Sequence, residues 1–191
     1  LVGSEMCIRN RVIRNPKLGP ACRQAQPSSV SEAVTGDIDS DAKENATLEV
    51  HKTQKPIKIG TDCSGLETPV LALRRLKVHF DHSFSCDNDE NVCKMIEANF
   101  QPQVKFGDIV KREVSQVPEV DIYVAGFPCQ PFSTAGKQQG FSDEKGRGVI
   151  FFHVVEYIKQ KLPKVFILEN VKGIVTLENG KYLRSILKIL K

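Results

Sequence analysis

The chain has 191 residues, of which 40% are hydrophobic and 26% charged, and a formal net charge of +4. This length allows one domain with a buried core, and the composition is typical of a globular protein. The small charge excludes a highly basic nucleic-acid-binding tail. No stretch approaches the roughly 18 apolar residues that span a bilayer, so we expect no membrane partner. The six cysteines form no Cys-x-x-Cys pair and no histidine cluster accompanies them, so we expect no metal site.

Residues 1–55 differ from the rest of the chain. They contain no aromatic residue, and they carry three prolines, a cluster of arginines and then a cluster of acidic residues. Such a segment cannot bury enough apolar surface to offset its conformational entropy. We therefore predict a disordered tail or linker at 1–55 and a folded domain at 56–191.

From residue 57 onward, short apolar β-forming runs alternate with amphipathic segments. This alternation predicts an α/β fold with a doubly wound, mostly parallel sheet. The run 165–168 is wholly apolar, so we expect it to be buried on both faces. The polar, glycine-containing segment 133–148 predicts a loop. The expected strands are 57–62, 79–86, 104–106, 120–125 and 165–168. The expected helices are 69–77, a helix capped by Asn88 or Asp89 that runs to Asn99, 149–161 and 180–190.

In doubly wound sheets, ligands bind beyond the carboxyl ends of the strands. The first such turn contains Gly65, where backbone can approach a ligand closely, but it has neither the G-x-G-x-x-G pattern nor a P-loop. Asp87 follows the second strand, where a carboxylate can accept both ribose hydroxyls. Asp108 follows the third and could accept the exocyclic amine of adenine. Each is commonly a turn or cap residue, but together they indicate an adenosine cofactor without phosphate, S-adenosyl-L-methionine.

The fourth and fifth turns carry the reactive side chains. Cys129 is flanked by Pro128 and Pro131, which hold it on a stiff backbone at the end of a strand. A lone cysteine is more often a small core residue, but its place at the ligand edge favours a nucleophile. Glu169 ends the last strand, where a carboxylate is costly unless it is paired or functional.

These turns resemble the DNA (cytosine-5)-methyltransferase family. The stretches DIYVAGFPCQPFS (121–133), GKQQG (136–140) and KVFILENV (164–171) place the Pro-Cys-Gln and Glu-Asn-Val motifs in the order and spacing of that family. The resemblance covers about 57–191 and implies a class I, Rossmann-like methyltransferase fold. The first turn has Cys63 where the family usually has an aromatic residue. The family's Gln-x-Arg-x-Arg motif and target-recognition region are not found, so we expect a domain truncated before its last strands.

The resemblance also implies a mechanism on DNA with the target cytosine flipped out. Cys129 would attack C6 of the base, Glu169 would hold a proton at N3, and Asn170 would orient backbone around the Pro-Cys turn. Gln130 and Ser133 would contact the nucleotide's phosphate. The implied cofactor-binding residues are Asp62, Cys63, Ser64, Gly65, Leu66, Asp87, Asn88, Asp108, Ile109, Gly126, Pro128 and Ile150.

Three other interpretations stay open from the sequence. The tRNA-methylating branch shares the chemistry, but it usually has a second proline in place of Phe127. An inactive, truncated chain could bind partners only. An unrelated adenosine-binding domain would need both motifs to arise by chance. We expect nuclear localisation in a eukaryote and cytoplasmic localisation otherwise.

Overall fold

A computed structural model describes residues 55–133, 140–142 and 146–190. The predicted tail, apart from its last residue, lies outside these described residues. Within the described ranges, no helix is both long enough and apolar enough to cross a membrane.

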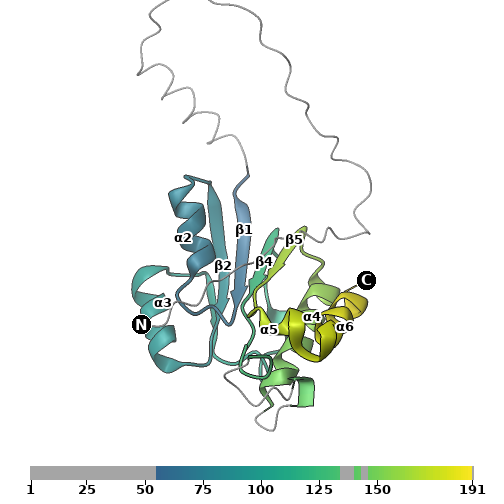
Figure 1. The fold of residues 1–191 in the computed structure, drawn as a ribbon. Helices are drawn as coiled ribbons and strands as arrows, with labels where there is room; N and C mark the ends of the chain where they lie inside the picture. Colours follow the sequence, from purple (N-terminus) through teal and green to yellow (C-terminus); the bar gives the residue numbers. More distant parts are fainter. Residues whose placement is uncertain (1–54, 134–139, 143–145, 191) are drawn as a thin grey trace, which may run out of the picture. The chain divides into compact units, whose positions relative to one another are not determined.

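Five parallel strands form one sheet in the order β3-β2-β1-β4-β5 (Figure 1). From β1 at the centre of the sheet, the chain first adds β2 and β3 on one side and then adds β4 and β5 on the other side. The reversal places the carboxyl ends of β1 and β4 side by side, where Asp62 is paired with Ala125. This confirms the predicted doubly wound parallel fold, and it creates the crevice in which such sheets bind ligands. The strands are β1 (Ile57–Asp62), β2 (Phe80–Cys86), β3 (Val104–Phe106), β4 (Ile122–Ala125) and β5 (Val165–Leu168).

Helices cover both faces of the sheet. Figure 1 shows α2 and α3 on one face and α4, α5 and α6 on the other. Part of the predicted loop 133–148 forms two short 3-10 turns, and its segments 134–139 and 143–145 lie outside the described residues. The helices are α2 (Thr68–Arg75), α3 (Glu90–Asn99), α4 (Ile150–Lys161), α5 (Gly173–Thr176) and α6 (Lys181–Ile189), and the 3-10 turns are η1 (Val114–Gln116), η2 (Gly140–Ser142), η3 (Arg147–Val149) and η4 (Leu177–Gly180).

Local sequence signals set several helix ends. Pro69 lies in the first turn of α2, where its missing N–H costs no hydrogen bond. The Asp89 side chain caps α3 by accepting hydrogen bonds from the backbone N–H groups of Asn91 and Val92 at 2.8 and 3.2 Å. Leu162 ends α4 in the left-handed conformation, just before Pro163. The predicted helices therefore form close to their expected bounds.

The core has two parts, one on each face of the sheet. The larger part lies against α4 and α6 and is rich in aromatic side chains, among them Tyr123 and Phe151. The smaller part lies under α2 and α3 and includes Ile59 and Phe100, but no residue of β5. Because β5 is the edge of the described sheet, Ile167 is 50% exposed. The expectation that this strand is buried on both faces is therefore wrong.

Candidate functional site at the carboxyl ends of the strands

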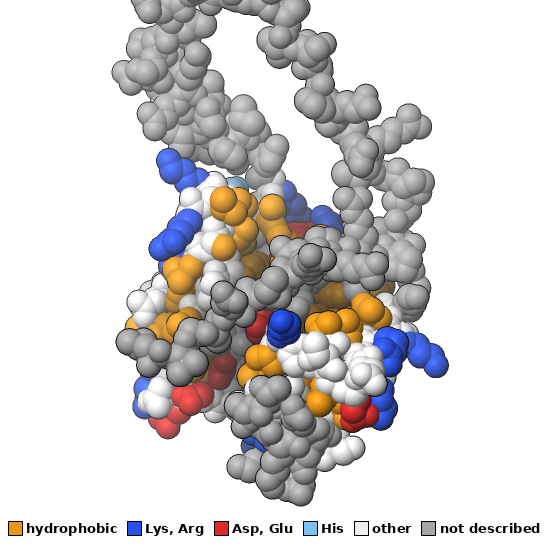
Figure 2. All heavy atoms as spheres, in the orientation of Figure 1, with side chains coloured by type: hydrophobic (Ala, Val, Ile, Leu, Met, Phe, Trp, Pro, Cys, Tyr) orange, Lys and Arg blue, Asp and Glu red, His pale blue; other side chains and the backbone are white. Residues whose placement is uncertain are grey.

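Backbone hydrogen bonds join the five predicted turns along one edge of the sheet. The N–H of Ser64 donates to the carbonyl of Cys86 at 3.1 Å, and the N–H of Gly126 donates to the carbonyl of Asp62 at 3.3 Å. The N–H of Glu169 donates to the carbonyl of Ala125 at 2.9 Å. Figure 2 shows acidic side chains gathered at this edge, near the start of α3. The structure thus brings together turns that lie more than 100 residues apart in the chain, 61–68 and 169–173.

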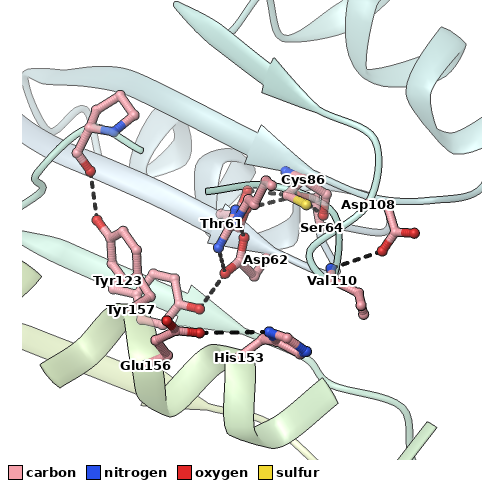
Figure 3. Close-up of polar contacts among 12 residues, drawn as sticks. Thr61, Asp62, Ser64, Cys86, Asp108, Val110, Tyr123, His153, Glu156 and Tyr157 are labelled. Atoms are coloured by element: carbon pink, nitrogen blue, oxygen red, sulfur yellow. Dashed lines mark hydrogen bonds and ion pairs between the residues drawn. The ribbon is translucent and has the colours of Figure 1, made fainter. Parts of the chain in front are cut away.

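The first turn is tied to the ends of β1 and β2. The Ser64 hydroxyl accepts a hydrogen bond from the N–H of Cys86 at 3.0 Å and lies 2.8 Å from the Thr61 hydroxyl (Figure 3). Ser64 is buried, so its side chain serves the fold rather than the surface of the site. Leu66, two residues further on, is 71% exposed and offers an apolar side chain at the same edge.

The second turn is built around the Asp87 carboxylate. Its two oxygens accept hydrogen bonds from the N–H groups of Gly65 and Asp89, each at 3.0 Å. A carboxylate can accept about four hydrogen bonds, so each oxygen retains a lone pair for a ligand hydroxyl. Asn88, the neighbouring predicted cofactor residue, is exposed. This geometry is compatible with the predicted ribose contact.

The third turn places Asp108 beside Ile109. One oxygen of Asp108 accepts a hydrogen bond from the N–H of Val110 at 2.9 Å, and the other lies 3.7 Å from the Lys111 ammonium. Ile109 is buried in the larger core. Asp108 therefore shapes its own turn, as the more common role of such a residue predicts, and it remains partly exposed.

The Asp62 side chain has partners that the sequence does not reveal. Its side chain is buried, and both oxygens accept hydrogen bonds at 2.5 Å from the Arg112 guanidinium, while the Tyr123 hydroxyl also donates to it. Figure 3 shows Asp62 and Tyr123 joined in this way. The Asp62 carboxylate is therefore paired within the core, and a contact between this residue and the cofactor stays a prediction.

Arg112 is a residue that the sequence pattern does not reveal. Its side chain is 3% exposed, and its guanidinium lies 5.4–5.9 Å from the ring centroids of Phe84, Phe106 and Tyr157. Burial alone would lower the pKa of Arg112, but the adjacent Asp62 carboxylate raises it overall. In sequence, Arg112 stands in a polar run 50 residues from its partner, so no local signal could have identified the pair.

The fourth turn presents Cys129. Its carbonyl accepts hydrogen bonds from the N–H groups of Phe132 and Ser133, both at 2.9 Å, which closes a tight turn. Cys129 is partly exposed, whereas Phe132 is buried beneath it in the larger core. The aromatic core thus supports the turn from below, and the neighbouring Gln130 is exposed.

Asn170 joins the fifth turn to the fourth. Its side-chain nitrogen donates to the carbonyl of Phe127 at 2.9 Å, and its side-chain oxygen accepts from the N–H of Val171 at 3.0 Å. Asn170 thus contacts the backbone that leads into the Pro-Cys turn, which its predicted role requires, and that role stays a prediction. Gly173 strengthens the same connection, because a Cβ at this position would lie 2.1 Å from the carbonyl oxygen of Phe132.

Gly126 marks the point where three turns meet. A Cβ on Gly126 would lie 3.5 Å from Oε2 of Glu169 and 3.8 Å from the carbonyl oxygen of Cys63. The glycine therefore leaves space between the first, fourth and fifth turns. Pro128 and Ile150, both partly buried, complete the set of predicted residues near this edge.

The four cysteines that the structure describes are free thiols, but they differ in environment. Burial, reinforced by the negative charges of Asp62 and Asp87, raises the pKa of the Cys63 thiol to about 12. Burial and Asp62 also raise the pKa of Cys86. Both thiols therefore resist ionisation near neutral pH. Within the described ranges, no group of three or more His, Cys, Asp or Glu side chains could hold a metal ion.

Comparison with known proteins adds independent evidence. Residues 62–191 match the family described as C-5 cytosine-specific DNA methylase. Type II methyltransferase M.NgoBI of Neisseria gonorrhoeae is 47% identical over 108 residues, which cover 56% of this chain and 33% of that protein. Type II methyltransferase M.BanI of Aneurinibacillus aneurinilyticus is 42% identical over 120 residues, which cover 63% of this chain and 27% of that protein. The chain thus spans about a third or less of the length of these relatives.

The fold is similar to that in the crystal structure of the S. pombe Dnmt2 methyltransferase. The TM-score is 0.54 at 17% sequence identity, and the match covers 70% of this chain and 40% of that one. This similarity supports a Rossmann-like methyltransferase fold. The family match covers more than half of the chain and extends from Asp62 in the first turn through the fifth turn, so the chain belongs to the C-5 cytosine-specific DNA methylase family.

Proposed function

We propose that this chain carries the catalytic centre for methyl transfer from S-adenosyl-L-methionine to C5 of cytosine in DNA, through a covalent bond between Cys129 and the base. The observation that carries the proposal is the meeting of the Pro-Cys-Gln turn with the Glu-Asn-Val turn, joined by the hydrogen bond from Asn170 to the carbonyl of Phe127. Family membership supports the reaction type.

The residues at the edge fit an adenosine cofactor. The space at Gly126 is bounded by the Cys63 carbonyl and the Glu169 carboxylate. Leu66 offers exposed apolar surface, and Asp87 keeps acceptor capacity for ribose hydroxyls. When bound, S-adenosyl-L-methionine would supply an electrophilic methyl group for C5. The cofactor residues that we propose are Cys63, Gly65, Leu66, Asp87, Asn88, Asp108, Gly126 and Pro128, together with Ser64 and Ile109, which are buried, and Ile150, which is partly buried.

The protein's own residues would activate the base. The Cys129 thiolate forms a bond to C6, and the electron pair of the C5–C6 double bond moves to C5. Glu169 holds the proton at N3, which limits charge on the ring and contributes roughly 10²–10⁴-fold. After methylation, a base removes the C5 proton, the double bond forms again and the C6–S bond breaks to release the thiolate. Because C6 is stacked inside duplex DNA, the cytosine must first flip out, at a cost of a few kcal/mol.

The environments of the cysteines support Cys129 as the nucleophile. Only a thiolate attacks efficiently, and the raised pKa values of Cys63 and Cys86 disfavour that form. Cys129 lies outside the core, on a turn held by backbone contacts. Cys93 is also partly exposed, but it lies in α3 and its thiol donates to the carbonyl of Asp87. Cys129 is therefore the thiol that we propose as the nucleophile.

The direct test uses Cys129→Ser in the full-length protein, alongside wild type that transfers methyl groups to the same oligomer. We expect this variant to lose methyl transfer to a DNA oligomer, measured with radiolabelled S-adenosyl-L-methionine, because a hydroxyl ionises far less readily than a thiol. Cofactor affinity, measured by calorimetry, should stay within error of the wild type. A variant that still methylates DNA would show that the covalent step is wrong.

A trapping experiment identifies the attacking sulfur. A DNA oligomer with 5-fluorocytosine lacks the C5 proton that must leave, so the covalent adduct should accumulate. Peptide mass spectrometry is expected to place this adduct on Cys129, and an adduct on Cys63 or Cys86 would contradict the proposal. A tRNA substrate assayed in parallel tests the alternative branch of the chemistry.

A further inference from the structure

Glu67 is a buried carboxylate in a strained backbone conformation, and no step of the proposed mechanism uses it. It precedes the first residue of α2 with φ 53° and ψ 39°, in the left-handed region that favours glycine. Its side chain is 0% exposed. A residue other than glycine is disfavoured here unless its side chain makes compensating interactions.

The Glu67 side chain makes such interactions with two neighbouring strands, β1 and β2. Oε1 of Glu67 accepts a hydrogen bond from the Thr61 hydroxyl of β1 at 2.8 Å and another from the Ser85 hydroxyl of β2. His82 Nε2 lies 2.9 Å from the Ser85 hydroxyl oxygen and 3.5 Å from Oε1. Since Ser85 gives its only proton to Glu67, Nε2 of His82 must carry the hydrogen that joins it to Ser85. Oε1 of Glu67 thus accepts hydrogen bonds directly from Thr61 and Ser85, and His82 is joined to it through Ser85.

Ser64 and Gly65, in the same turn as Glu67, also connect it to Cys86 at the end of β2 and to Asp87 just beyond it. The N–H of Gly65 donates to Asp87 at 3.0 Å, and the Ser64 hydroxyl accepts from the N–H of Cys86. Glu67 adds the connection at the far end of the turn. Leu66, the exposed apolar residue of the turn, lies between the Gly65 and Glu67 connections.

We propose that Glu67 is a positioning residue that fixes the turn 63–67 for cofactor binding through its hydrogen bonds to Thr61 and Ser85. The inference rests on the proposed function, because it assigns this turn to S-adenosyl-L-methionine. Glu67 does not touch the cofactor. The hydrogen bonds of its carboxylate offset the backbone strain at this position and hold Leu66 and Gly65 in the conformation that binds the cofactor.

The central test compares Glu67→Gly with Glu67→Gln in the full chain. Glycine relieves the strain but removes the two hydrogen bonds to Thr61 and Ser85, so cofactor affinity measured by calorimetry should fall about tenfold, the usual effect of losing two buried hydrogen bonds. Glutamine keeps an acceptor oxygen for Thr61 and Ser85, so its affinity should stay within about threefold of the wild type. Affinity for a DNA oligomer should be the same in all three proteins.

A matched control separates the effect of relieving backbone strain from the effect of losing the hydrogen bonds of Glu67. Lys77 has the same φ of 53°, but its side chain is exposed. Lys77→Gly should leave cofactor affinity unchanged and should not lower the melting temperature. All affinities are measured at a temperature at which urea titration shows every variant to be folded.

Ser85→Ala provides a second test that leaves the turn's backbone intact, in case Glu67→Gly does not fold. It removes one donor to Glu67 from β2, and it should weaken cofactor binding severalfold with DNA affinity unchanged. If wild-type protein binds the cofactor but Glu67→Gly or Ser85→Ala binds it equally well, the positioning role is overturned while the proposed function stands. If wild-type protein binds no S-adenosyl-L-methionine, the proposed function fails, and the inference fails with it.

Discussion

The two halves of the site are held in place by different forces. On the side of β1, β2 and β3, buried charged groups connect the turns, above all the ion pair between Asp62 and Arg112. On the side of β4 and β5, the turn around Cys129 is held by close backbone packing against Gly173 and by one amide hydrogen bond from Asn170. The proposed cofactor turns thus depend on electrostatic pairing, and the proposed nucleophile depends on steric fit.

This difference predicts that substitutions in the two halves of the site will have different effects. A buried ion pair is weak evidence for stability as a pair, but the loss of one partner leaves an uncompensated buried charge. A backbone contact, in contrast, is broken by adding a single methyl group. Substitutions on the first side should therefore affect the whole fold, and substitutions on the second side should mainly affect the position of Cys129.

The largest effect is expected from Arg112→Ala. It leaves the buried Asp62 carboxylate without its partner, which should lower the free energy of unfolding by about 3–5 kcal/mol. Urea titration followed by circular dichroism measures this change. The double variant Asp62→Leu/Arg112→Leu removes both charges and should recover most of the loss. If the double variant is less stable than Arg112→Ala, the pair is not the source of the effect.

Gly173→Ala should have an intermediate effect. Alanine normally stabilises a helix relative to glycine, but here its Cβ would lie 2.1 Å from the carbonyl oxygen of Phe132. The strain should cost about 1–3 kcal/mol and should displace the Cys129 turn, so that methyl transfer falls more than cofactor affinity. Gly107→Ala is the control, because a Cβ there meets no atom within 4 Å. Equal effects of the two substitutions would contradict the steric account.

Asn170→Ala should have the smallest effect on stability, about 1 kcal/mol, because it removes one neutral hydrogen bond to the carbonyl of Phe127. The expected signature is a reduced rate of adduct formation at Cys129 with unchanged cofactor affinity. Asn170→Asp is the matched variant, since it retains the acceptor for Val171 but loses the donor to Phe127. An adduct rate equal to the wild type in both variants would show that the amide does not orient the turn.

Much of the fold could be predicted from local patterns. The strands at 57–62, 104–106 and 165–168 have the predicted bounds, because apolar β-forming runs end at polar turns. The cap of α3 at Asp89 follows from the chemistry of one side chain. The burial of β5 could not be predicted, since an apolar run does not show whether a neighbouring element covers it.

In the candidate site, too, some residues could be predicted from local sequence and others could not. The motifs around Cys129 and Glu169 point to covalent cytosine chemistry because they are contiguous in the chain and specific in their order. The roles of Asp62, Arg112 and Glu67 could not be read from the chain, because each depends on partners that other strands or turns bring close.

The sequence alone therefore determined the order of the strands and main helices and the family, and it supplied the residues that we propose to react, since these depend on short-range pattern and on motif spacing. Only the tertiary structure decided which carboxylates remain available at the edge of the sheet and which are buried in the fold. Burial makes an unpaired charge costly, and so the partner of each carboxylate decides its role. In this chain Asp87 keeps acceptor capacity for a ligand, Asp62 is paired with Arg112, and Glu67 connects the first turn to the strands.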